Sequence, residues 1–409
     1  MGRGLKPSLV VVGNGMAGMR TVEELLALDA GMYDITVFGA EPRVNYNRIM
    51  LSPVLAGEKT ADEIVLHPRS WYQQHGITLH AGDPVVAIDR RRRVVRARSG
   101  LEVAYDRLLL ATGSQPFIVP VPGAQLPGVV GFRDLDDVDT MLAAAQQGGH
   151  AVVIGGGLLG LEAANGLLKR GMAVTVVHLT GSLLNQQLDG DASLLLKAAL
   201  EHRGLRILLG VQTAAILGDD RVSGVRFTDG RETPADLVVM AAGVRPNVAL
   251  ARDCGLHVER AIVVDDTLQS YDPRVYAVGE CVQHRKATFG LVAPIWDQAR
   301  VCAAHLAGFG HRRYVQQATA TKLKVTGIDL YSAGDIVGGP GTEDLVLRDR
   351  RAGVYKRLVL AGSRLTGAVL YGDVADGPWY FDLIQRGADV SALRDRLLFG
   401  PALCEAQAA

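Results

Sequence analysis

The chain has 409 residues, of which 48% are hydrophobic, and its 43 lysines and arginines balance 43 acidic residues. That length predicts two or three domains, and this hydrophobic content is enough to fill their cores, which excludes a mainly disordered chain. The formal net charge of zero gives no sign of a nucleic-acid-binding protein. No apolar run approaches the roughly 20 residues that span a bilayer, so we expect no membrane partner.

The N-terminal segment from Met1 to Pro7 carries Arg3 and Lys6 but no apolar core or cleavage site of a signal peptide, so we expect a cytoplasmic protein. The four cysteines stand singly, and their spacing predicts neither a redox disulfide nor a metal site. We expect no bound metal and, at these positions, buried or incidental thiols: Cys254, Cys281, Cys302 and Cys404.

A first glycine motif follows the apolar, β-branched run 9–12 and precedes a stretch with helical spacing, 21–28. In G-x-G-x-x-G, the first glycine makes a tight turn, the second lets the backbone approach a pyrophosphate, and the third lets the helix pack on the strand. The helix N-terminus then directs its free N–H groups at the phosphates. The predicted contacts are Gly13, Asn14, Gly15, Met16, Ala17 and Gly18.

The same order recurs at a second motif, where the run 151–154 leads into glycines and then into helical spacing over 161–169. The predicted contacts are Gly155, Gly157, Leu158, Leu159 and Gly160. Two such motifs in one chain predict two bound dinucleotides. The alternative is that one copy is degenerate and keeps only its tight turn.

The residues at or just after the end of the second strand of each unit, the strand that follows the glycine motif, indicate how a ribose is bound. Glu41 follows the strand 33–38, at the distance where an acid accepts a hydrogen bond from a ribose hydroxyl. The corresponding strand 173–178 ends at His178, which is neither the acid that selects NAD nor an arginine suited to NADP. The lack of a basic cluster there favours NADH. Arg48 is a candidate pyrophosphate clamp, because a guanidinium matches two phosphate oxygens.

Two strand-to-turn crossovers separate the predicted domains. The strand 105–110 runs into Ala111, Thr112 and Gly113, and the strand 236–240 runs into Ala242 and Gly243. Arg133, just beyond a proline-rich linker, is a candidate phosphate or flavin contact. Strand patterns from 321 to 371 and helical spacing from Trp379 predict an α+β C-terminal domain.

The predicted fold is therefore α/β, with two Rossmann-like dinucleotide-binding domains and a small C-terminal α+β cap. We expect a discontinuous first domain at 1–118 and 243–315, a second domain at 119–242, and a cap at 316–409. Between the strand patterns 85–88 and 94–98 lies a run of four arginines, Arg90 to Arg93. It is predicted to be a solvated hairpin tip, with a docking site for an electron acceptor as the alternative.

Several segments carry a specific resemblance: Gly13 to Arg20, Tyr46 to Ile49, Gly155 to Gly166, Val174 to Leu179, and Tyr276 to His284. Over essentially its whole length the chain resembles the N-terminal flavin module of the large subunit of bacterial NAD(P)H nitrite reductase. It is also similar to the electron-transfer subunit of assimilatory nitrate reductase. The resemblance implies a glutathione-reductase-like fold with FAD at the first motif and NAD(P)H at the second.

The resemblance also implies roles for individual residues. Glu280, in Gly279-Glu280-Cys281, stands where the family's acid binds the ribityl chain of FAD, and Glu162 stands where an acid lies near the nicotinamide. The stretch 45–53 resembles a segment of flavin-dependent ferredoxin reductases that places a lysine near the flavin. This chain has Pro53 at that position, and whether Lys59 substitutes for the lysine stays open. Glu162 and Lys59 are thus the catalytic candidates. Further cofactor contacts are expected at Ser52, Lys59, Val86, Ala111, Thr112, Gly113, Gly279, Pro294, Ile295 and Trp296. The last three begin a predicted helix whose N-terminus would stabilise negative charge on a reduced flavin.

The implied function is transfer of a hydride from NAD(P)H to FAD, and of single electrons to an iron–sulfur, sirohaem or molybdenum protein. Because the chain ends at Ala409 without a cysteine cluster, we expect an electron-input subunit of assimilatory nitrite or nitrate reductase that does not itself reduce nitrite. The alternatives are a rubredoxin or ferredoxin reductase of another pathway and a slow-turnover flavoprotein redox sensor. A homo-oligomer stays open, and the lack of a cysteine pair disfavours a disulfide reductase.

Overall fold

The computed structural model describes residues 6–325 and 327–405. Arg3, in the N-terminal segment 1–7, and Thr326, in the alternating stretch 321–331, lie outside the described residues. The chain divides into two compact units. Unit 1 comprises 1–50, 59–115 and 244–317, and unit 2 comprises 51–58, 116–243 and 318–409. Within the described residues, no helix is both long and apolar enough to cross a membrane.

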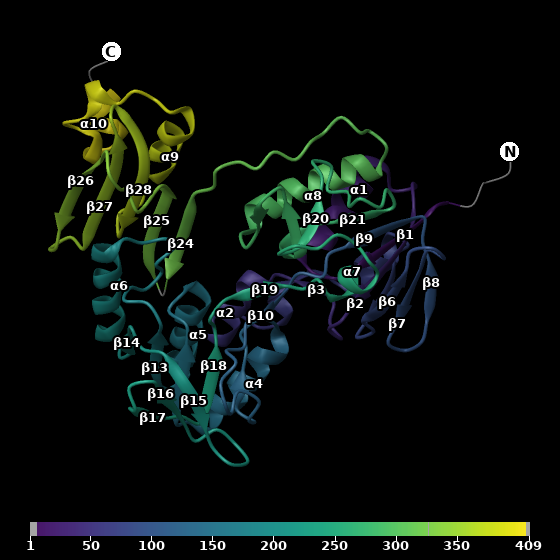
Figure 1. Cartoon of the computed structure of the whole chain (residues 1–409), viewed down its shortest axis with the longest axis horizontal. Helices are drawn as coiled ribbons and strands as arrows, with labels where there is room; N and C mark the ends of the chain where they lie inside the picture. The colour runs from purple at the N-terminus through teal and green to yellow at the C-terminus, as the bar shows by residue number, and fades with distance from the viewer. Residues whose placement is uncertain (1–5, 326, 406–409) are drawn as a thin grey trace. The chain divides into compact units, whose positions relative to one another are not determined.

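Unit 1 is built on a five-stranded parallel sheet. Its strands, in spatial order, are β21 (Val275–Ala277), β9 (Arg107–Leu110), β1 (Ser8–Val12), β2 (Asp34–Gly39) and β5 (Thr78–Ala81). The apolar runs of β1 and β9 are fully buried, as expected for parallel strands covered on both faces. Helices α1 (Met16–Asp29) and α8 (Val292–Leu306) lie side by side (Figure 1) and pack against each other.

Shorter elements complete unit 1. An antiparallel sheet of three strands contains β6 (Val85–Asp89), β7 (Val94–Ala97) and β8 (Glu102–Ala104). The β6–β7 pair is the predicted hairpin, and the four arginines form its tip, so this prediction is confirmed. The remaining elements are β3 (Asn45–Tyr46), η1 (Arg48–Met50), η2 (Asp62–Ile64), β4 (Val65–His67), α3 (Arg69–Gln74), α7 (Ala249–Asp253), β20 (Ile262–Val264), η3 (Gly279–Cys281), β22 (Val282–His284) and β23 (Ala287–Thr288).

Unit 2 repeats the parallel sheet. The strands, in spatial order, are β11 (Val129–Val130), β18 (Leu237–Met240), β12 (His150–Ile154), β13 (Ala173–His178) and β14 (Arg206–Leu209). Its other elements are α2 (Leu51–Leu55), α4 (Leu135–Gln147), α5 (Leu158–Lys169), α6 (Gly190–His202), β15 (Thr213–Leu217), β16 (Gly224–Phe227) and β17 (Glu232–Pro234). The two crossovers run through β10 (Ser114–Pro116) and β19 (Val244–Pro246), which pair with each other.

The C-terminal part of unit 2 is an antiparallel five-stranded sheet with helices on it. The strands are β24 (Thr321–Val325), β25 (Ile328–Gly334), β28 (Arg364–Tyr371), β27 (Val354–Ala361) and β26 (Thr342–Asp349). The helices are α9 (Gly377–Arg386), η4 (Ser391–Leu393), η5 (Leu397–Phe399) and α10 (Pro401–Glu405). The alternating stretch 321–331 is two strands that pair with each other, β24 and β25. Two Rossmann-like sheets and an antiparallel C-terminal sheet confirm the predicted fold class.

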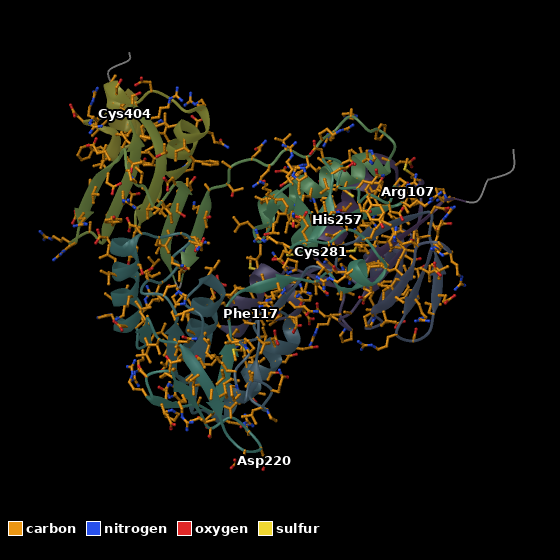
Figure 2. All side chains as sticks on the ribbon, in the orientation of Figure 1. Arg107, Phe117, Asp220, His257, Cys281 and Cys404 are labelled. Carbon is orange, nitrogen blue, oxygen red and sulfur yellow. The ribbon has the colours of Figure 1, made fainter. Side chains whose placement is uncertain are left out.

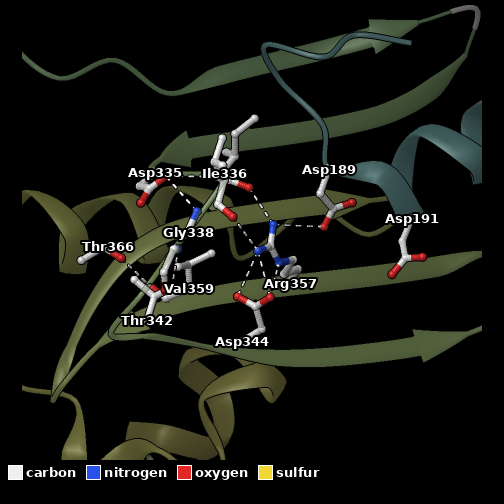
Figure 3. A network of polar contacts seen from close by, with 12 residues as sticks. Asp189, Asp191, Asp335, Ile336, Gly338, Thr342, Asp344, Arg357, Val359 and Thr366 are labelled. Atoms are coloured by element: carbon white, nitrogen blue, oxygen red, sulfur yellow. Dashed lines mark hydrogen bonds and ion pairs between the residues drawn. The ribbon is translucent and has the colours of Figure 1, made fainter. Parts of the chain in front are cut away.

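A polar network joins this C-terminal sheet to the N-terminus of α6 (Figure 3). Arg357 on β27 bonds the Asp344 carboxylate from Nε (2.9 Å), and its Nη1 lies 3.6 Å from a carboxylate oxygen of Asp189. The Tyr355 hydroxyl also donates to Asp189, at 2.6 Å. Asp189 in turn caps α6 by accepting from the Ala192 N–H (2.8 Å). One side chain thus stabilises both the start of α6 and its contact with the C-terminal sheet.

Candidate dinucleotide-binding sites

The first glycine motif lies between β1 and β9, where the order in which successive strands are added to the parallel sheet switches from one side of β1 to the other. Gly13 has φ +121°, and a Cβ on it would lie 2.1 Å from the Ala111 carbonyl oxygen. A Cβ on Gly18 would lie 2.5 Å from the Gly13 carbonyl oxygen. Only glycine fits at these two positions. A Cβ on Gly15, by contrast, would meet no atom within 4 Å, so the structure leaves space at the start of α1.

The second motif has the same geometry, between β12 and β18. Cβ atoms on Gly155 and Gly160 would lie 2.1 Å from the Ala241 oxygen and 2.0 Å from the Gly155 oxygen, while one on Gly157 would meet nothing within 4 Å. Neither α1 nor α5 has a side-chain cap on its N-terminus or an acid in its first turn. Their first N–H groups therefore suit an anion. Both motifs fit a pyrophosphate, and this argues against a degenerate second copy.

At the end of β2, the structure brings together two residues for which separate roles are predicted. The Tyr46 hydroxyl donates to Glu41 (2.6 Å), Arg48 forms an ion pair with the same carboxylate, and the Arg48 guanidinium lies over the Tyr46 ring, 5.4 Å from its centroid. Glu41 and Arg48 thus lie at the carboxyl end of the sheet, where the first motif opens. Their assignment to the ribose and pyrophosphate of FAD stays a prediction.

Two residues that the sequence analysis did not single out hold Asn14, which lies between the first two glycines. The Asn45 side-chain amide donates to the Asn14 carbonyl oxygen (2.9 Å), and the Tyr72 hydroxyl donates to its side-chain oxygen (2.7 Å). Asn45 is 1% exposed and Tyr72 is 2% exposed. Asn45 lies on β3 and Tyr72 on α3, and neither has a regular spacing from the motif that the sequence alone could reveal.

In the second motif the corresponding residue is Gly156, and His178 holds it. The Gly156 N–H donates to Nδ1 of His178 (3.0 Å), and Nε2 of His178 lies 2.9 Å from the Thr180 hydroxyl. The Gly156 carbonyl accepts from the Leu184 N–H (3.0 Å). Burial lowers the pKa of His178, so the neutral imidazole is favoured. His178 thus lies at the predicted place, but it bonds the glycine loop.

Glu162, on α5, accepts a 2.5 Å hydrogen bond from Ser52 on α2. Burial raises the pKa of Glu162, and the Ser52 hydroxyl partly offsets this. Helix α2 is fastened to α5 by Arg170, which donates from Nε to the Leu55 carbonyl (2.7 Å) and from Nη2 to the Val54 carbonyl (3.2 Å). Lys59 is exposed in the loop after α2. Hence Ser52, predicted as a cofactor contact, is the described partner of Glu162.

The turn that carries Glu280 packs against the first motif. A Cβ on Gly279 would lie 2.8 Å from the Ala17 side chain, and the Gly279 N–H donates to the buried Gln298 (2.8 Å). Glu280 accepts from the Ser114 hydroxyl at 2.9 Å, just beyond Ala111-Thr112-Gly113, and the Thr112 hydroxyl donates to the Asn247 carbonyl (2.6 Å). Gln298 was missed because it lies on α8, remote in sequence from the glycines.

The start of α8 has the predicted form. Pro294 is in its first turn, no side chain caps its N-terminus, and Ile295 is buried. The Arg20 guanidinium lies over the half-buried Trp296 ring, 5.7 Å from the ring centroid, and so joins α1 to α8. Trp296 therefore has a packing partner within the protein, and its contact with a flavin stays a prediction.

For four other predicted contacts, the surrounding geometry does not indicate a cofactor site. Val86 is exposed at a bulge in β6. The Arg133 backbone N–H donates to Asp137 (2.6 Å), whose buried carboxyl has a pKa raised to about 6. Ala242 and Gly243 are exposed at the second crossover, where the Gly243 carbonyl accepts from the Phe117 N–H (2.9 Å). Their roles are untested predictions.

The arginine hairpin lies at the opposite end of the unit 1 sheet from the first glycine motif. The Arg93 carbonyl accepts from the N–H of Tyr105, which lies between β8 and β9. Arg90 donates from Nε to the Cys254 carbonyl (2.8 Å) and pairs with Asp272 (3.1 Å). These contacts are at the amino ends of the strands, whereas dinucleotides bind at the carboxyl ends. The geometry favours a structural hairpin tip over a docking site for an acceptor.

The four cysteines are buried or half-buried within the protein. Cys281, labelled in Figure 2, is buried on η3 and Cys302 on α8, while Cys404 is buried on α10 and Cys254 is half-buried after α7. None of these four cysteines forms a disulfide. Among the described residues, no cluster of three or more His, Cys, Asp or Glu side chains has the geometry of a metal site.

Comparisons with known proteins identify two family regions. Residues 7–305 match the model described as pyridine nucleotide-disulphide oxidoreductase, and residues 320–388 match the rubredoxin NAD+ reductase C-terminal domain. A solved structure of a ferredoxin reductase from Rhodopseudomonas palustris is 27% identical, with a TM-score of 0.82, and the match covers 94% of this chain and all of that one.

Two curated relatives from Bacillus subtilis are closer in sequence. A nitrite reductase [NAD(P)H] is 48% identical over 94% of this chain and 48% of its own length. An assimilatory nitrate reductase electron transfer subunit is 43% identical over 96% of this chain and 51% of its own length. The chain therefore spans about half the length of the curated relatives it matches. It belongs to the pyridine nucleotide-disulphide oxidoreductase family.

Proposed function

We propose that this protein takes a hydride from NAD(P)H, with NADH favoured, onto FAD and passes single electrons to an iron–sulfur, sirohaem or molybdenum protein. It would serve as the electron-input part of an assimilatory nitrite or nitrate reductase. The observation that carries the proposal is the pair of glycine motifs, each with open space at an uncapped helix N-terminus. The identities with the two Bacillus subtilis relatives support the choice of pathway.

When bound, FAD would supply the ability to accept two electrons together and release them singly. The chain's own residues would bind and orient. Gly15 and Gly157 leave room for two pyrophosphates, while the Glu41–Arg48 pair at β2 and Glu280 on η3 offer polar groups to the FAD ribose, pyrophosphate and ribityl chain. Glu162, held by Ser52, would face the nicotinamide. Holding donor and acceptor in line contributes on the order of 7–11 kcal/mol of barrier lowering.

A second candidate is a rubredoxin or ferredoxin reductase of another pathway. The match of residues 320–388 to the rubredoxin NAD+ reductase C-terminal domain and the similarity to a ferredoxin reductase favour it. The chemistry of the two glycine motifs would be the same, and only the electron acceptor would differ.

The test is stopped-flow reduction of the purified flavoprotein by NADH without air, followed by mixing with candidate acceptors. We expect rapid bleaching of the flavin, and reoxidation by the nitrite or nitrate reductase partner that is faster than reoxidation by rubredoxin or ferredoxin. Preference for rubredoxin or ferredoxin would select the second candidate. Bleaching with no competent protein acceptor would indicate a redox sensor. A colourless protein that NADH does not affect would refute all three.

A further inference from the structure

The two glycine loops are held by side chains of different chemistry. In the first motif, Asn14 is held by the Asn45 amide and the Tyr72 phenol. The amide does not titrate, and burial raises the pKa of Tyr72 to about 12. In the second motif, the corresponding Gly156 is held by the imidazole of His178, which is the side chain that ordinarily changes charge near neutral pH.

The hydrogen bonds determine which form of His178 fits. Because the Gly156 N–H can only donate, Nδ1 of His178 must accept and carries no proton. The Thr180 hydroxyl donates to the Ser182 carbonyl (3.1 Å), so it accepts the proton on Nε2 of His178. A protonated imidazole would place an N–H against the Gly156 N–H. The described geometry therefore requires the neutral ring with its proton on Nε2.

His178 also determines the shape of the loop. A Cβ on Gly156 would lie 2.8 Å from Cγ of His178 and 2.7 Å from Leu183, so the ring and the loop are in direct contact. The Gly156 carbonyl is bonded from the other side by the Leu184 N–H. Both backbone polar groups of Gly156 are thus taken by residues 178–184. The position of the following residue, Gly157, beside the open space depends on them.

Among the residues that the structure describes, no charged side chain contributes to the shifted pKa of His178. Its polar neighbours are the Gly156 N–H, the Thr180 hydroxyl and the Ser182 carbonyl, and burial is the main cause of its lowered pKa. The ionisable residues on the surrounding elements are engaged elsewhere or lie at the other end of the sheet. Glu162 on α5 bonds Ser52, Asp189 caps α6, and Arg206 begins β14 at its amino end.

We propose that His178 is a positioning residue: as a neutral imidazole it holds the second glycine loop in the shape that accepts a pyrophosphate, and its protonation weakens binding of either nicotinamide dinucleotide while FAD stays bound. This rests on the proposed function, which assigns NAD(P)H to the second motif. Since the ring bonds the loop, it supplies no charge for the 2′-phosphate of NADPH. NADH and NADPH are therefore affected by the same factor.

The experiment is calorimetric titration of NAD+ into the FAD-loaded protein between pH 5.5 and pH 8. The folded pKa of His178 is lowered, so affinity is constant above about pH 6.5, the ordinary histidine value. Below the lowered pKa it falls by up to about tenfold per pH unit. The flavin absorbance of the retained protein is expected to stay constant over the same range.

Two substitutions separate positioning from a general structural role. His178→Asn keeps an oxygen acceptor near the position of Nδ1 and is expected to bind NAD+ well, with no dependence on pH. His178→Ala removes the acceptor and is expected to weaken binding about tenfold at every pH, raising KM with little change in kcat. The matched control is His150→Asn, because His150 is also a partly buried histidine with a lowered pKa, but at the amino end of β12.

A second measurement does not depend on the variants folding. In protein labelled with 15N histidine, the His178 resonance is expected to show an unprotonated Nδ1 at pH 8. The inference is overturned if Nδ1 carries the proton, if His178→Ala binds NAD+ like the wild type, or if His178→Asn keeps the wild-type pH dependence. If the wild type binds no NAD+ even at pH 8 and is not reduced by NADH, the proposed function fails and the inference fails with it.

Discussion

At the scale of single residues, the glycines of each motif have different roles. Gly13 is required by the protein itself, because its Cβ position is occupied by the Ala111 carbonyl, whereas Gly15 faces open space. This difference matters for experiments, because the motif alone predicts that replacing either glycine abolishes flavin binding. Only the spatial surroundings tell a folding glycine from a binding glycine.

Gly13→Ala is therefore expected to destabilise the fold by on the order of 2–4 kcal/mol, through backbone strain and overpacking. Gly15→Ala is expected to change stability by less than about 1 kcal/mol, while FAD affinity falls at least tenfold because a methyl group enters the space for the pyrophosphate. Urea unfolding and bound-flavin absorbance measure the two effects. Equal stability loss in both variants would contradict this division.

Glu162 gives a residue-scale prediction about pH. Its pKa is raised above the ordinary value of about 4.5 because it is buried with a neutral partner, Ser52. The stability that the neutral carboxyl contributes is fully present below that value and is lost as the pH rises through the raised pKa. Glu162→Gln removes this loss, so the variant should gain stability relative to the wild type between pH 4 and pH 7.

Urea midpoints at several pH values check the Glu162 prediction. Glu58→Gln is the control, since Glu58 is an exposed carboxylate that pairs with Lys169. A constant difference between wild type and Glu162→Gln across this range would show that burial does not perturb the carboxyl.

At the scale of elements, the attachment of α2 to α5 was not visible in the sequence. Helical spacing predicted α5, and the stretch 45–53, which includes the start of α2, was noted for its resemblance to a flavoprotein segment. Nothing in the local sequence of α2 or α5 indicates that these two helices pack together. The contact depends on Gly166, where a Cβ would lie 2.7 Å from the Leu55 side chain, and on Arg170 capping the end of α2. Such pairings are decided by the fold, because the two segments are more than a hundred residues apart.

Two adjacent basic residues test this attachment. Arg170→Ala leaves the Leu55 and Val54 carbonyls without a charged donor and is expected to cost about 1.5–3 kcal/mol. Lys169→Ala breaks only the exposed pair with Glu58 and is expected to cost less than about 1 kcal/mol. The urea midpoint of each variant measures the effect. Similar losses of stability in both variants would show that Arg170 does not attach α2 to α5.

The position of the arginine hairpin in the fold distinguishes between the two interpretations of the four consecutive arginines. Charge alone allowed either a solvated tip or a docking site, but Arg90 and Arg93 bond the amino ends of the sheet. Arg91→Glu combined with Arg92→Glu is therefore expected to leave KM for an iron–sulfur acceptor within about twofold of the wild type, because electrostatic steering acts near the docking site. A KM increase of tenfold or more at low salt would instead indicate that the acceptor docks at this hairpin.

At the scale of the whole molecule, two copies of one architecture are expected to bind their ligands independently. Gly157→Ala fills the open space of the second motif without touching the first. We expect a protein that keeps its FAD and stays yellow but is no longer bleached by NADH at concentrations that reduce the wild type. Gly15→Ala is the reciprocal variant. Loss of FAD from Gly157→Ala would contradict independent sites.

The sequence by itself determined the number and order of the nucleotide-binding folds, the hairpin and the C-terminal α+β domain. The reason is physical: glycine spacing, strand runs and helical periodicity are set by neighbouring residues, so they can be read locally. The glycines stand out because two of each motif's positions admit no Cβ at all.

Only the tertiary structure decided which side chains complete each site. Asn45 and Tyr72 hold the first loop, His178 holds the second, and Ser52 is the partner of Glu162. These partners come from other elements, often far along the chain, and a hydrogen bond between them leaves no periodic trace in the sequence. His178 was read as a position that selects a ribose, and its bond to Gly156 became evident once β13 and the glycine loop were seen side by side.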